Sequence, residues 1–66
     1  MARVRHCYGE KPVVIEITAA TFSEVFAELG EVLKSHEHEG RYPLSVTTHF
    51  SQDKVKDYCI LVVVLS

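Results

Sequence analysis

YCILVVVL, residues 58–65, is apolar at every position and decides the fold. Successive residues of a strand point to opposite faces of a sheet, so both faces of this strand are apolar. One face carries Tyr58, Ile60, Val62 and Val64, and the other carries Cys59, Leu61, Val63 and Leu65. A strand with two apolar faces belongs in the interior of a sheet that is covered on both sides. The sequence therefore places residues 58–65 between two neighbouring strands.

Two segments supply those neighbours. Residues 13–18 are rich in β-branched side chains, and residues 44–50 alternate apolar and polar side chains. Both are predicted to run antiparallel to residues 58–65, in a split βαβ arrangement, with a polar hairpin loop over residues 51–56. Residues 4–8 also alternate, which fits either a short edge strand or a segment that folds over the second face of the sheet.

A helix is predicted from Phe22. Thr21 and Glu24 form a capping box, in which the threonine hydroxyl accepts a hydrogen bond from the backbone of Glu24 and the carboxylate reaches back. The helix should fade across residues 35–39 and stop at Gly40. An apolar stripe at helical spacing follows the cap and consists of Phe22, Val25, Phe26, Leu29, Val32 and Leu33. The predicted class is therefore α+β: one amphipathic helix on a three- to four-stranded, mostly antiparallel sheet, in the order (β)βαββ.

Length and composition describe one domain, residues 1–66. A chain of 66 residues has a marginal core, and 47% hydrophobic residues argue against disorder. A net charge of −2 makes nucleic-acid binding unlikely. Cys7 and Cys59 are too few for a secreted disulfide scaffold and are interpreted as free thiols. The first eight residues have no signal-peptide pattern, and no apolar run is long enough to span a bilayer. We expect a cytoplasmic protein with no membrane association.

Three residue groups contain side chains of the types used in catalysis or metal binding. His6 and Cys7 are neighbours in an extended segment, so they point to opposite faces and cannot form a nucleophile–base dyad. His36 and His38 are two apart, whereas helical metal ligands stand four apart. Glu16, near His49 on the sheet, is the one acid–base candidate, and a solvated ion pair accounts for it better. The sequence predicts no catalytic residues, no metal site and no cofactor.

Two surfaces are predicted to bind other chains. Glu24, Glu28 and Glu31 form a row on the helix face opposite the apolar stripe, which is usually a solvated face but would also suit a basic partner. The sheet face away from the helix should carry Glu16 and His49 around an apolar patch. The residues assigned to self-association through this patch are Val14, Leu61, Val63 and Leu65, with the other parity of residues 58–65 kept open as the alternative.

The motifs are generic and identify no family. The predicted function is a small intracellular non-enzymatic binding protein, a homodimer or higher homo-oligomer, that regulates or inhibits an unidentified protein partner by occupying its surface. Two alternatives stay open. One is an oligomer that binds a small ligand or metal between subunits, and the other is a tiny enzyme with an interface active site that uses Glu16, His49 or His6.

Overall fold

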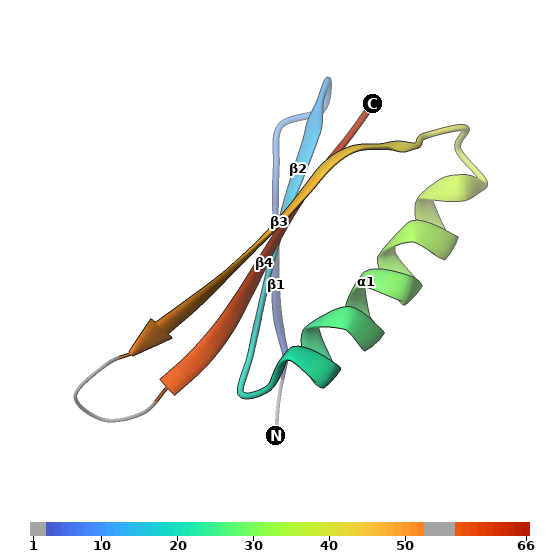
Figure 1. The fold of residues 1–66 in the computed structure, drawn as a ribbon. Coiled ribbons are helices and arrows are strands. Elements are labelled where there is room, and N and C mark those ends of the chain that lie inside the picture. The colour runs from blue at the N-terminus through green and yellow to red at the C-terminus, as the bar shows by residue number, and fades with distance from the viewer. Residues whose placement is uncertain (1–2, 53–56) are drawn as a thin grey trace.

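The computed structural model describes residues 3–52 and 57–66 and contains one helix on one four-stranded sheet. The elements are β1 (Val4–Tyr8), β2 (Val13–Ala19), α1 (Phe22–Glu37), β3 (Pro43–Gln52) and β4 (Asp57–Leu65). The sheet order is β1-β2-β4-β3, every neighbouring pair is antiparallel, and α1 lies along one face (Figure 1). The predicted α+β class is confirmed, and so is the place of β4 between β2 and β3.

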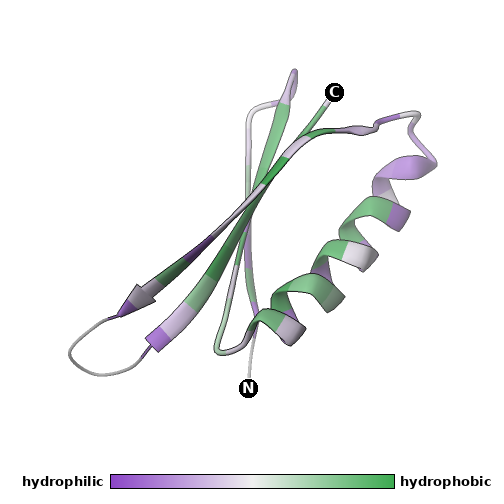
Figure 2. Ribbon diagram, in the orientation of Figure 1, coloured by the Kyte–Doolittle hydropathy of each residue, from purple (hydrophilic) through white to green (hydrophobic). Residues whose placement is uncertain are grey.

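The register between β2 and β4 explains which side chains meet α1. Ile15 pairs with Val63 and Ile17 pairs with Leu61, so the apolar parity of β2 lies beside one parity of β4. Figure 2 shows apolar residues along β2, β4 and α1. The buried core consists of Val13, Ile15, Ile17, Ala19, Val25, Val32, Cys59, Leu61, Val63 and Leu65.

This core corrects the residues predicted for self-association. Leu61, Val63 and Leu65 are fully buried beneath α1, so in this fold they are unavailable to a second chain. The parity of β4 that faces away from α1 is the alternative one. It comprises Tyr58, Ile60, Val62 and Val64, all half-buried.

The helix begins where the capping pattern places it. The backbone N–H of Glu24 donates to Thr21 Oγ1 at 3.3 Å, and Thr21 has the extended backbone of an N-cap. One oxygen of the Glu24 carboxylate, Oε2, is buried without a hydrogen-bond partner in the described part of the chain, so this oxygen does not make the reciprocal bond of the capping box. The helix extends to Glu37, and Gly40 has the positive φ of 75° expected at a helix stop.

The N-terminal segment is an edge strand. β1 pairs with β2 from Val4 opposite Thr18 to Tyr8 opposite Val14, so it extends the sheet instead of covering its second face. Gly9, with φ of 72°, starts the turn into β2. Of the predicted hairpin loop at residues 51–56, Ser51 and Gln52 belong to β3, and residues 53–56 lie outside the described residues. No helix in the described ranges is long and apolar enough to cross a membrane.

Candidate functional site

The sheet face away from α1, here called the open face, has an apolar centre that no described element covers. Its centre is formed by Val14 of β2 and by Ile60, Val62 and Val64 of β4, all half-buried. The flanking strands contribute Val4, His6 and Tyr8 from β1, and Ser45, Thr47 and His49 from β3, all exposed. An apolar centre with a more polar rim is the usual anatomy of a protein–protein interface.

Glu16 and His49 both lie on the open face, as predicted, but they are not neighbours. Glu16 is opposite Val62 on one side, and His49 is opposite Ile60, so β4 separates them. Adjacent strands are about 4.8 Å apart, which puts these two residues on the order of 10 Å from each other. The residue directly opposite Glu16 is His6 of β1. Placing Glu16 near His49 was therefore wrong, because β4, which the sequence already placed between β2 and β3, keeps the two residues apart.

The acidic row on α1 is not a uniformly solvated face. Glu28 contacts Arg5 (Nη1 to Oε2, 3.2 Å) and Arg3 (Nε to Oε1, 3.6 Å), and its side chain is only 13% exposed. Glu31, which is 69% exposed, lies 3.9 Å from Arg3 Nη1. The prediction that this row lies opposite the core is wrong for Glu28. This residue comes three positions after buried Val25 and four before buried Val32, and residues at these spacings lie on the same side of a helix.

Two of the three glutamates in the acidic row are poorly placed to bind a partner, one because of ion pairing and one because of burial. The carboxylate of Glu28 is already matched by two arginines, and Glu24 is half-buried. Only Glu31 of the three offers a mostly exposed carboxylate. A basic partner would therefore meet less negative charge on α1 than the sequence indicates.

β3 is a second uncovered feature of the sheet. It is an outer strand of ten residues, and all of them except Ser51 are exposed. On the α1 side it carries Val46, Thr48 and Phe50, opposite Val63, Leu61 and Cys59. Val46 is 44% exposed and Phe50 is 56% exposed, although both are apolar. The sequence showed the alternation of this strand but not that α1 would leave its apolar side uncovered.

The flank of α1 toward β3 continues this apolar surface. Because Glu28 faces β1, residues on the far side of the helix face β3, and Phe26 lies about 160° around the helix from Glu28. Phe26 is 50% exposed and its ring lies 6.4 Å from that of Phe22. The predicted apolar stripe is thus wider than the part of it that packs on the core, and its Phe22–Phe26 side remains exposed.

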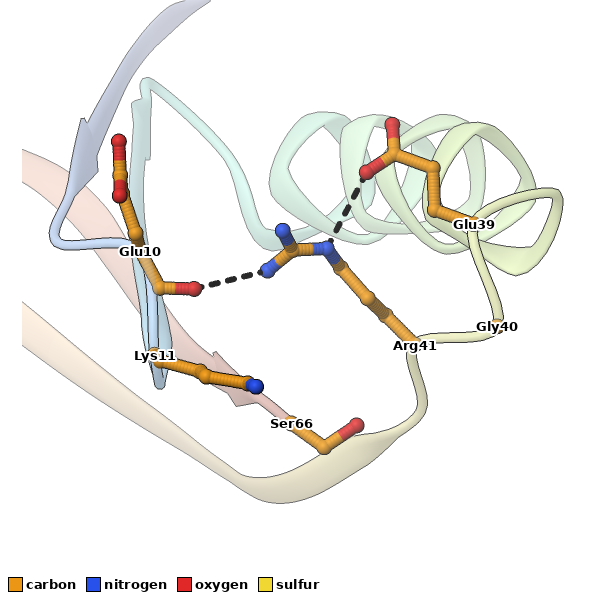
Figure 3. Close-up of a pocket in the computed structure, with 6 residues that line it drawn as sticks. All are labelled: Glu10, Lys11, Glu39, Gly40, Arg41 and Ser66. Carbon is orange, nitrogen blue, oxygen red and sulfur yellow. Dashed lines mark hydrogen bonds and ion pairs between the residues drawn. The ribbon is translucent and has the colours of Figure 1, made fainter.

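A depression of about 590 Å³ lies where the turn after β1 meets the segment after α1 (Figure 3). It is lined by Glu10, Lys11, Glu39, Gly40, Arg41 and Ser66. Arg41 bridges the two sides, since its Nε contacts Glu39 Oε1 at 3.2 Å and its Nη1 donates to the carbonyl oxygen of Glu10 at 3.2 Å. Arg41 therefore ties the β1–β2 turn to the end of the helix. These contacts use two of its five N–H donors.

The thiols and histidines are spread over different parts of the fold. Cys7 is exposed on β1 and Cys59 is buried on β4, and both are free. These strands are separated by β2, so the two Cα atoms are at least about 10 Å apart, beyond the ~7 Å limit for a disulfide. Across residues 3–52 and 57–66, no three His, Cys, Asp or Glu side chains gather closely enough to hold a metal ion.

Comparison with protein-family models, curated proteins and solved structures finds no match to this chain. The functional argument therefore depends on geometry. Two surfaces carry it: the open face of the sheet and the exposed outer edge of β3.

Proposed function

We propose that this chain is a non-enzymatic binding protein that self-associates and that regulates or inhibits a partner protein by occupying its surface. The observation that carries the partner-binding part of the proposal is the open face. Four large apolar side chains at its centre, Val14, Ile60, Val62 and Val64, are only half-buried, and no described element covers them. Burying a side chain of this kind is worth about 1.5–3 kcal/mol, so water contact on this face is costly.

The rim of the open face supports selective binding. Glu16 and His6 lie opposite each other on one side of the apolar centre, and Thr47 and His49 lie on the other. Polar groups at a rim set register and partner choice more than they set affinity. Glu16 and His49 therefore keep a proposed role in partner contact, each on its own side of the patch.

The test uses Val62, at the centre of the open face. Val62→Lys places an ammonium group in the patch. We expect the fold to accommodate it, because the new side chain lies opposite Glu16 of the neighbouring strand β2. Ser35→Lys is the matched control, since it adds the same charge at an exposed position on α1. Both variants should give the circular dichroism spectrum of the parent chain.

The measurement is cross-linking in the native host followed by mass spectrometry of the captured proteins. A partner of the open face should be recovered with the parent chain and with Ser35→Lys, and recovery should fall at least about tenfold with Val62→Lys, the effect of roughly 1.4 kcal/mol. Equal recovery with a well-folded Val62→Lys protein would show that partners bind elsewhere.

A further inference from the structure

We infer that the self-association proposed above occurs through β3, which pairs antiparallel with β3 of a second copy around a two-fold axis at Thr48. The inference rests on the proposed function and adds its geometry. Among the described residues, no strand pairs with the outer backbone edge of β3, and its ten residues include no Asp, Glu, Lys or Arg. Natural proteins protect such edges with charges, proline or bulges. Here Pro43 and the bulge between Pro43 and Ser45 protect only the first residues, and Ser45–Gln52 is regular.

Symmetry selects the register. A two-fold axis perpendicular to the sheet makes the two edge strands antiparallel and keeps the same face of each copy on the same side. An axis at Thr48 pairs Ser45 with Ser51 of the second copy and so uses all of the regular part except Gln52. It places Val46 of each copy opposite Phe50 of the other, which gives two such pairs. Between these pairs, Thr48 of one copy lies opposite Thr48 of the other. Aromatic and β-branched residues are favourable cross-strand pairs, and so are two threonines.

The open face is a poorer choice for the second copy. Stacking two open faces would bury Glu16 of each copy, and burying a carboxylate is costly unless it is paired and hydrogen-bonded. Pairing along β3 buries no charged side chain, because the strand has none. It also leaves Val62 and its neighbours available for the partner that the proposed function requires.

The size of the contact predicts a dimer of moderate strength. Taking 150–250 Å² for a whole aromatic side chain, the exposed parts of Leu44, Val46 and Phe50 plus the strand backbone come to roughly 400–500 Å² per copy. Two copies thus bury on the order of 900 Å², close to the ~1,000 Å² at which specific interfaces begin. We expect dissociation in the micromolar range, with both α1 helices on one side of an eight-stranded sheet.

The experiment is cysteine cross-linking at neighbouring threonines. In a Cys7→Ser background, Thr48→Cys puts two thiols across the axis with Cα atoms about 4.5–5.5 Å apart, within disulfide range. Thr47→Cys is the matched control, because it is equally exposed but lies one residue from the axis, so its Cα is about 8 Å from its equivalent. Under mild oxidation, Thr48→Cys should form covalent dimers at least about tenfold faster. Sedimentation of the parent chain should show a dimer that Val46→Lys weakens and Val62→Lys does not.

Each outcome has one meaning. Equal or faster cross-linking of Thr47→Cys would overturn the register. A parent chain that stays monomeric to high micromolar concentration would overturn β3 pairing, even if partner capture still depends on Val62. A dimer broken by Val62→Lys but not by Val46→Lys would move the second copy to the open face. Partner recovery that Val62→Lys leaves unchanged, together with an intact β3 dimer, would leave this inference standing and refute the partner site of the proposed function alone.

Discussion

The ion pairs between β1 and α1 give a quantitative prediction about Glu28. Glu28→Gln keeps the shape of the side chain and removes its charge, so Arg3 and Arg5 lose their shared carboxylate. An exposed pair contributes about 0.2–1 kcal/mol, and screening is weaker here because Glu28 is only 13% exposed while the arginines remain partly in water. We expect the free energy of unfolding to fall by about 1–2 kcal/mol.

Glu31→Gln is the control, because Glu31 carries the same charge on the same helix but is 69% exposed and 3.9 Å from Arg3. It should cost less than about 0.5 kcal/mol. Both variants are measured by urea denaturation with circular dichroism, at one protein concentration because self-association shifts the midpoint. The difference between them should shrink in about 1 M NaCl, where the Debye length is about 3 Å. Equal losses for the two variants would refute the inference that Glu28 holds β1 against α1.

Three further predictions test the core, the thiols and the helix cap. Leu61→Ala should lower the free energy of unfolding by about 2–5 kcal/mol, and Ile60→Ala by less than half as much, because only Leu61 is fully buried; equal losses in thermal melts would contradict the assignment of the core side. Ellman's reagent should react quickly with one thiol of the folded protein, Cys7, and reach Cys59 only after unfolding, whereas two fast thiols would show an accessible Cys59. Thr21→Ala should lower the free energy of unfolding by about 1 kcal/mol, and Thr21→Ser should lower it little, because the serine hydroxyl can still accept a hydrogen bond from the backbone N–H of Glu24. Similar losses for the two variants in denaturant titrations would mean that the hydroxyl does not cap α1.

The features that the sequence predicted correctly each depend on a local or one-dimensional pattern. Thr21 marks the helix start because a capping hydroxyl acts within one turn. The central place of β4 follows from its apolar character at both parities. Cys59 is buried because it lies on an interior strand and on the face of that strand that the helix covers.

The features that were missed depend on pairing register. Ile60 and Leu61 are equally apolar, so composition alone cannot say which faces α1, and the answer comes from Leu61 lying opposite Ile17. The partners of Glu28 and Glu16 were missed for a related reason. These partners, Arg5 and His6, lie on β1, and the sequence does not decide whether this segment is an edge strand. The position of Glu28 between Val25 and Val32 was the one available signal that its side chain would be partly buried.

The place of β4 in the chain has a consequence for biosynthesis. β4 follows every other described element, yet β2, β3 and α1 all pack against it. A ribosome-bound chain that ends before residue 57 can form the β1–β2 hairpin, which is marginal by itself, and an amphipathic helix with half of its platform missing. At about 5–20 residues per second, translation of the last strand takes about one second. Until β4 has been made and has left the exit tunnel, the part of α1 that has emerged keeps its apolar side exposed, and the sheet cannot close.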